Sequence, residues 1–302
     1  MRAQPKSHIF ETRQRLFAWA LSAAAAVMIS LLAYLVWSGY IEAIDKARVA
    51  TFNYAAILEA RIESTLRRAD ASLEDLSRLV PPEALERGAV ARFAPEINGR
   101  LDRRMSKFPE VSAMRVFDAR GALLYSSDRA ASPEASGDGR EYFSHLRDDP
   151  KSGLVISEVI RARHSDKLLI VMARAIRDRA GVFRGAVYTP IELSYFQHLF
   201  QSLDVGPGGN IALYRSDDFS RVVRWPHTEG QLNQKLPEDS PTRAALAGDT
   251  RDATIEIRSA TDGIARIYSY HVLQNYPLFV SVGISRSDAL AEWRTRSLVV
   301  DM

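Results

Sequence analysis

An arginine followed by two aromatic residues is the arrangement in this sequence best suited to binding a small molecule. These residues are Arg140, Tyr142 and Phe143. A guanidinium presents a planar fork of N–H donors that matches both oxygens of a carboxylate. Neighbouring aromatic side chains add apolar walls and a hydroxyl. Adjacent side chains point to different sides, so we expect one of the two aromatic residues to pack in the core. The indicated chemistry is recognition of an organic anion; the alternative is an internal ion pair of Arg140 with a carboxylate nearby in the sequence, such as Glu141.

Four further residues are weaker candidates for the same pocket. Arg174 lies in an alternating run in which Ile170, Met172 and Arg174 share one face. An arginine on an apolar face needs an anionic partner, which is either a ligand or an internal carboxylate. Tyr188 is predicted on the adjacent strand, as a pocket wall or as a core residue. The remaining two candidates are Tyr125 and Ser157.

The sequence contains no catalytic or metal-binding pattern. It has no cysteine, which excludes disulfides, thiol chemistry and cysteine–metal sites. The histidines beyond residue 100 are scattered, without the spacing of metal ligands. They are His145, His164, His198, His227 and His271. Phosphate-binding loops, serine-hydrolase elbows and zinc-peptidase motifs are also missing. We therefore expect no catalytic residue, no metal and no cofactor.

Charge and length place limits on the class of protein. The chain has 302 residues and a net charge of +3, with acidic and basic residues interspersed. No basic block of the kind that binds nucleic acid is present. Beyond the N-terminal helical part, about 220 residues remain, enough for one large or two small domains.

The segment 16–37 contains no charged residue. At helical rise it spans about 33 Å, which is enough to cross a hydrocarbon core of about 30 Å. Trp19 and Trp37 lie near its ends, where amphipathic aromatic residues favour the headgroup region. A cleaved signal peptide would have a shorter apolar core. Arg13 and Arg15 lie just before the segment, and this basic excess predicts a transmembrane helix with its N-terminus in the cytoplasm.

The helical pattern continues beyond the membrane segment as far as two prolines. Apolar residues recur at alternating steps of four and three, which is a heptad-like seam. They are Ile62, Leu66, Ala69, Leu73, Leu76 and Val80. Pro81 and Pro82 end the helix because proline lacks the amide N–H. We expect a stalk helix whose far part packs on its own domain and whose near part packs on a second copy, giving a homodimer.

Beyond a helical region at 82–108, the hydrophobic period changes from that of a helix to that of a strand. The first set of strands is predicted at 111–117, 122–126, 154–157, 167–176 and 185–189, with helices at 140–146 and 191–203. The breaker 206–209 then separates a second set. That set has strands at 210–215, 221–225, 253–258, 264–272 and 278–284, with a short helix at 241–247. Ser285 is a predicted N-cap for a closing helix, with Asp288 three residues on.

This order of elements resembles the double Cache family, the two-lobed PAS-like sensor domains of bacterial membrane receptors. The resemblance covers residues 43–294. The most specific local match is Asp138-Gly139-Arg140-Glu141-Tyr142-Phe143, followed by Gly153-Leu154-Val155-Ile156-Ser157. Supporting matches lie at 170–174, 178–187 and 203–209. In style the sequence is most similar to sensors that precede diguanylate cyclase or histidine kinase modules.

The resemblance implies a ligand pocket in the membrane-distal lobe, capped by the segment around Arg140. In relatives that bind amino acids, an arginine and the aromatic residues after it hold the ligand carboxylate. Arg140, Tyr142 and Phe143 occupy those positions here. The same relatives hold the amino group with an aspartate near the end of the strand that contains Val187. The stretch 185–190 has no aspartate, so the resemblance supports recognition of a carboxylate but not of an amino group.

We therefore expect an α+β protein in six segments. They are a cytoplasmic tail (1–15), a transmembrane helix (16–37), a stalk helix (38–80), a membrane-distal PAS-like lobe (81–205), a membrane-proximal PAS-like lobe (206–284) and a closing helix (285–302). The last segment resembles the start of a second membrane helix that is truncated or missing.

The expected function is that of an extracytoplasmic sensor in the bacterial inner membrane, with both lobes in the periplasm. It would bind a small organic anion and signal through its helices, without enzymatic activity of its own. Expected partners are the ligand, the membrane, a second copy and an output module that is separate or missing, but no nucleic acid. One alternative is a ligand-free periplasmic protein-interaction module. Another is a sensor fragment of a diguanylate cyclase or histidine kinase.

Overall fold

The computed structural model describes residues 7–106, 108, 110–128, 136–163, 165–227, 230–248, 250–259 and 261–299. Part of the expected cytoplasmic tail, His164 and the last residues of the expected closing segment lie outside the described residues.

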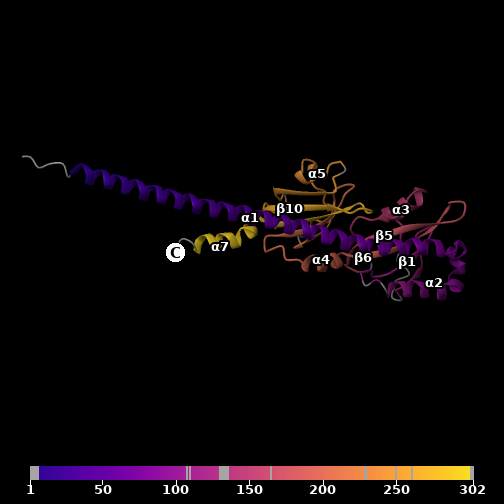
Figure 1. Ribbon diagram of the computed structural model, residues 1–302. Coiled ribbons are helices and arrows are strands. Elements are labelled where there is room, and N and C mark those ends of the chain that lie inside the picture. Colours follow the sequence, from indigo (N-terminus) through magenta and orange to yellow (C-terminus); the bar gives the residue numbers. More distant parts are fainter. Residues whose placement is uncertain are drawn as a thin grey trace, which may run out of the picture.

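One uninterrupted helix, α1 (Ser7–Leu79), joins the predicted membrane segment to the predicted stalk (Figure 1). Its 73 residues correspond to about 110 Å at helical rise. The helix ends before the two prolines as expected, and Pro82 begins the short 3-10 helix η1 (Pro82–Leu85). Among the described residues, α1 alone is long and apolar enough to cross a membrane, with a mean hydropathy of 2.2 over its most apolar window.

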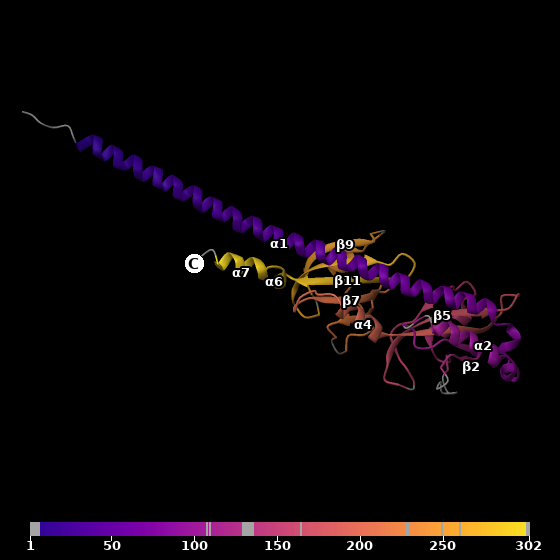
Figure 2. The same ribbon diagram turned by 60° about the horizontal axis from the view of Figure 1, so that its bottom comes forward.

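Two antiparallel sheets lie one after the other along α1, and the chain has the predicted α+β fold (Figures 1 and 2). The sheet farther from the N-terminus has the order β2-β1-β6-β5-β3, with β4 also paired to β5. Its strands are β1 (Arg115–Asp118), β2 (Leu123–Ser126), β3 (Val155–Ile156), β4 (Ile160–Arg161), β5 (Leu168–Arg177) and β6 (Phe183–Glu192). We call this sheet and its helices the distal lobe.

The second sheet lies nearer the N-terminal part of α1 and forms the proximal lobe. Its order is β8-β7-β11-β10-β9. The strands are β7 (Asn210–Arg215), β8 (Arg221–Trp225), β9 (Asp252–Arg258), β10 (Ala265–Val272) and β11 (Leu278–Ser285). The other helices are η2 (Arg87–Ala89), α2 (Val90–Met105), α3 (Glu141–Asp148), α4 (Leu193–Gln201), α5 (Pro241–Ala245), α6 (Arg286–Ala289) and α7 (Ala291–Val299).

The predicted closing helix begins as expected but is divided into α6 and α7. The Ser285 side chain caps α6 by accepting a hydrogen bond from the Asp288 N–H at 3.0 Å. The division falls at Leu290, which is buried against Ile44 and Ile267. Beyond it, α7 runs beside α1, and the Trp293 indole donates to a main-chain carbonyl of that helix.

The seam predicted for contact with a second copy is buried within this chain. Ile62, Leu66 and Leu73 have no exposed surface. They belong to one core cluster that also contains residues of both sheets, such as Met172 and Val280. An antiparallel sheet with one apolar face needs an element to cover that face, and α1 covers both sheets. The prediction that part of this seam contacts a second copy is therefore wrong.

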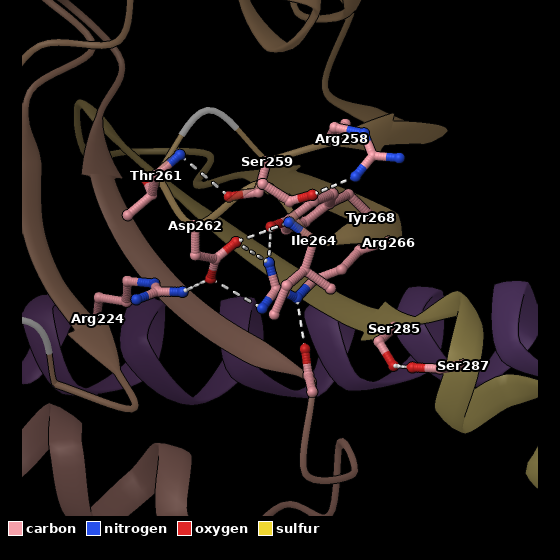
Figure 3. A network of polar contacts seen from close by, with 12 residues as sticks. Arg224, Arg258, Ser259, Thr261, Asp262, Ile264, Arg266, Tyr268, Ser285 and Ser287 are labelled. Atoms are coloured by element: carbon pink, nitrogen blue, oxygen red, sulfur yellow. Dashed lines mark hydrogen bonds and ion pairs between the residues drawn. The ribbon is translucent and has the colours of Figure 1, made fainter.

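A buried arginine network holds the turn between the lobes (Figure 3). Arg266 donates to both carboxylate oxygens of Asp262, at 2.7 and 2.9 Å, and to the Gly208 carbonyl at 2.6 Å. Arg224 donates to Asp262 at 2.6 Å. Burial alone would raise the pKa of Asp262, but hydrogen bonds, led by that from Arg266, outweigh burial and hold this pKa below its usual range. The Gly208 N–H donates to Asp288 of α6 at 2.8 Å, so the turn is bonded to both the sheet and the closing helix.

Candidate functional site

A pocket of 360 Å³ lies on the face of the distal sheet opposite α1. Alternation along each strand creates the two faces. In β5, Leu169 and Val171 line the pocket, whereas Ile170 and Met172 pack in the core shared with α1. The start of α3 and the segment around β4 close the pocket on the other sides. This volume is at the small end of the range for ligand sites, so it suits a small molecule.

Arg115 is one of the pocket residues that sequence reasoning missed, together with Arg163 and Lys167. It lies in β1 directly opposite Tyr188 of β6. Its Nη1 donates to the Tyr188 hydroxyl at 2.8 Å, and Nη2 lies 3.5 Å from the Asp128 carboxylate. Its Nε is buried and has no hydrogen-bond partner among the described residues. One signal was available: Arg115 is the one charged residue in the predicted strand 111–117 and shares a face with Phe117.

Two of the three residues of the arginine–aromatic motif line this pocket. Arg140 precedes α3 and donates to the main-chain carbonyl of Arg161 at 3.2 Å, and Tyr142 lines the pocket beside it. Phe143 instead packs edge-on against Phe117 in the small core behind the pocket. Phe143 is a core residue, as expected for one of the two aromatic residues, but Tyr142 is also buried in that cluster.

Two tyrosines supply neutral hydroxyl groups to the pocket. Tyr188 is stacked on Phe117, with ring centroids 4.6 Å apart, and it lines the pocket next to Tyr142. Burial raises the pKa of both phenols above the usual range. Both hydroxyls therefore stay protonated at physiological pH and are available as hydrogen-bond donors.

Arg174 and Tyr125 lie on the opposite face of the sheet, toward α1. The predicted shared face of Ile170, Met172 and Arg174 is confirmed, but it faces the helix. Arg174 Nε donates to Asp70 of α1 at 2.6 Å, so its anionic partner is the internal carboxylate. The Tyr125 hydroxyl donates to the Ala84 carbonyl at 2.7 Å. The structure does not bring these two candidates to the pocket, and their expected ligand role is corrected.

Ser157 lies outside the pocket, on a neighbouring cleft of 770 Å³ between the two lobes. Its Oγ accepts from the Val171 N–H at 2.9 Å, which fixes the end of β3 to β5. Arg215 of the proximal lobe donates to the Ser157 carbonyl at 3.1 Å. Arg140 and Tyr142 border both cavities. Ser157 is thus a structural residue between the lobes, next to the pocket.

The comparison with protein families now decides the class of this fold. A family model described as Cache domain matches residues 42–293. The chain belongs to the Cache domain family. The double Cache resemblance of the sequence is confirmed. Members of the Cache domain family are sensory input domains without a catalytic role of their own. No curated protein matches this chain.

Solved structures of sensory domains share this Cache fold. The extracellular domain of the histidine kinase rpHK1S-Z16 is 25% identical, with a TM-score of 0.67, and the match covers 83% of this chain and 99% of that one. The periplasmic sensory domain of the Campylobacter jejuni chemoreceptor Tlp1 is 12% identical, with a TM-score of 0.63 and coverage of 82% and 96%. The ligand-binding domain of the Pseudomonas fluorescens chemoreceptor CtaA, in complex with L-isoleucine, is 14% identical, with a TM-score of 0.57 and coverage of 82% and 96%. The chain therefore carries a Cache sensor domain similar to those of chemoreceptors and histidine kinases.

Proposed function

We propose that this chain is an extracytoplasmic sensor whose distal pocket binds a small organic anion. The observation that carries this proposal is the Arg115 guanidinium on the pocket wall, which lies beside Arg140 and the Tyr188 hydroxyl. An incoming carboxylate would supply acceptors for Arg115 and Arg140 and would accept from the Tyr188 hydroxyl. The CtaA domain binds L-isoleucine, which also presents a carboxylate.

We further propose that the N-terminus is cytoplasmic and that both lobes lie in the periplasm, anchored in the bacterial inner membrane. The basic residues that precede the apolar segment support this orientation. The proposed lobes are 81–205 and 206–284, with the closing helices after them. The catalytic output would be supplied outside the lobes described here.

Ligand binding would act by favouring one arrangement of the lobes and helices over another. The contacts around Gly208 provide a route for this change. That turn connects the distal lobe to β7, and its main chain is bonded both to Arg266 of the proximal sheet and to Asp288 of α6. A shift of the distal lobe would therefore reach the closing helix through the hydrogen bond to Asp288 and the proximal sheet through the hydrogen bond from Arg266.

Dimerisation is proposed along a different side of α1 from the buried seam. Ile41, Val49 and Phe52 are 41%, 60% and 39% exposed and share one side of the helix between the membrane segment and the core. Exposed apolar side chains at such spacing favour contact with a second α1.

Arg115→Gln is expected to remove most of the stabilisation by the ligand. The measurement is thermal unfolding of the full chain in detergent micelles, against a panel of mono- and dicarboxylates. A ligand at a hundred times its dissociation constant adds about 2.7 kcal/mol to the free energy of unfolding. Removing the guanidinium should weaken binding by about 30-fold or more, because a charge-assisted hydrogen bond and its charge are lost.

The matched control is Arg120→Gln, an exposed arginine in the β1–β2 turn, which should leave the ligand effect unchanged. Circular dichroism of the unliganded variants tests whether Arg115→Gln still folds, and Arg115→Lys provides a second, charge-retaining variant. If Arg115→Gln binds the same carboxylate as tightly as the wild type, the proposed pocket is wrong.

A single cysteine at Val49 is expected to yield a disulfide-linked dimer on mild oxidation of the membrane-embedded chain. The natural sequence has no cysteine, so any crosslink comes from the introduced thiol. Arg61→Cys is the control, since this exposed position is rotated by about 120° around the helix. Equal crosslinking at both positions would indicate random collision instead of a defined α1–α1 contact.

A further inference from the structure

The charges that line the distal pocket do not balance. Its cationic side chains are Arg115, Arg140, Arg163 and Lys167, and its carboxylates are Asp128 and Glu192. Among the described lining residues there are thus two more positive than negative charges. Charges that line a small cavity are only partly screened by solvent, so a ligand of opposite charge is favoured.

Both carboxylates of the pocket already have a cationic neighbour. Asp128 lies 3.5 Å from Arg115 Nη2, and Glu192 accepts from Lys167 at 2.8 Å. An ammonium group on a ligand would have to compete with these ion pairs for either carboxylate. The pocket is therefore poorly prepared for the amino group of an amino acid, although it can accept a carboxylate.

The other two cations have only main-chain partners in the described part of the chain. Arg140 donates to the Arg161 carbonyl at 3.2 Å, and Arg163 donates to the Asp138 carbonyl at 2.7 Å. A carbonyl oxygen accepts a hydrogen bond but does not neutralise the guanidinium charge. Both side chains border the pocket. Burial raises the pKa of the Tyr142 hydroxyl, whereas the charges of Arg140, Arg163 and Arg115 each lower it. The three guanidinium groups therefore all lie near this one hydroxyl.

We propose that the ligand is a dianion, namely a short dicarboxylate. This inference rests on the proposed anion-binding function of the same pocket. One carboxylate binds Arg115 and the Tyr188 hydroxyl, and the other lies between Arg140 and Arg163. A monocarboxylate leaves one guanidinium charge unmatched, and an amino acid brings an ammonium group close to the arginines.

The test compares each dicarboxylate with its own monomethyl ester, which keeps the carbon chain and removes one charge. Titration calorimetry of the full chain in detergent micelles would use malonate, succinate, glutarate and adipate. We expect the best dicarboxylate to bind about tenfold or more tightly than its ester, since one charge-assisted contact is at stake. Arg163→Gln should reduce this ratio toward one while leaving ester binding nearly unchanged. Arg140→Gln should also reduce the ratio.

Arg161→Gln is the matched control. Arg161 lies two residues before Arg163, but its side chain is exposed and paired with Asp166. It should keep the wild-type ratio. Equal affinity for a dicarboxylate and its ester would overturn the proposal of a dianionic ligand but not the proposal of an anion-binding pocket. Tighter binding of inorganic phosphate would overturn the two-carboxylate arrangement, and tighter binding of 4-aminobutyrate would overturn the charge argument. If neither the diacids nor the esters bind to a folded wild-type chain, the proposed function fails as well.

Discussion

Arg266→Met is expected to lower the free energy of unfolding by about 3 kcal/mol, the lower end of the cost of breaking a buried ion pair. Arg266 is 2% exposed and donates to Asp262, to the Gly208 carbonyl and to the Tyr268 hydroxyl. Methionine fills much of the same space but leaves the carbonyl without its donor. The cost stays at the lower end because Arg224 still pairs with Asp262. The measurement is equilibrium urea unfolding of the full chain in micelles, followed by circular dichroism.

Arg258→Met provides a matched comparison on the neighbouring strand. That side chain is exposed and donates to the Gly263 carbonyl, so its loss should change stability by no more than about 0.5 kcal/mol. The double variant Arg266→Met with Asp262→Asn should not recover this loss, because the carboxylate that it removes is still paired with Arg224. A loss below about 1 kcal/mol for Arg266→Met would show that the network is hydrated and contributes little.

Leu66→Ala is expected to lower the free energy of unfolding by about 3–5 kcal/mol, because the cavity left in a close-packed core cannot collapse fully. Leu66 has no exposed surface and belongs to the core cluster that α1 shares with both sheets. The loss should therefore appear as one cooperative transition shifted to lower urea concentration, and not as early melting of a single lobe. Tryptophan fluorescence and circular dichroism, recorded together, test whether the transitions coincide.

Ser64→Ala, at an exposed position two residues away on the same helix, should leave the midpoint nearly unchanged. Two separated transitions in Leu66→Ala would contradict the single shared core. A small effect at both positions would mean that α1 is weakly packed on the sheets.

Much of the fold was predictable because local signals agreed with the final structure. The prolines at 81 and 82 end α1, and the strands predicted at 210–215 and 221–225 coincide with β7 and β8. The strand predicted at 111–117 is shorter, since Val111 forms only an isolated bridge and β1 begins at Arg115. The partner of the helical seam was not predictable. An apolar stripe on a helix has the same spacing whether it covers a sheet or another helix.

The site was only partly predictable for a related reason. Alternation groups residues by face, but it does not say which face of a sheet meets a helix and which meets a ligand. Arg174 and Arg115 are both arginines in predicted strands, and the sequence alone does not say which of them faces a pocket. The structure pairs Arg174 with Asp70 of α1 and brings Arg115 to the pocket wall. Both residue chemistry and the family resemblance indicated Arg140, but only the resemblance supplied a position for it in the fold.

A single helix covers both sheets, which limits where this Cache sensor domain can be joined to parts of other sensor domains. Consider a chimera in which the distal lobe is joined at the 206–209 turn to the proximal lobe of another sensor domain. The distal lobe would keep α1, and the proximal sheet of the other protein would pack against a helix whose side chains do not match it. The buried pair of Thr51 with Ser269 and the partly buried pair of Asp70 with Arg174 show how specific that surface is on each sheet. Natural or engineered exchange of sensory modules should therefore succeed at joints before Ile44 and after Leu290, where the whole two-lobed unit moves with its own helix.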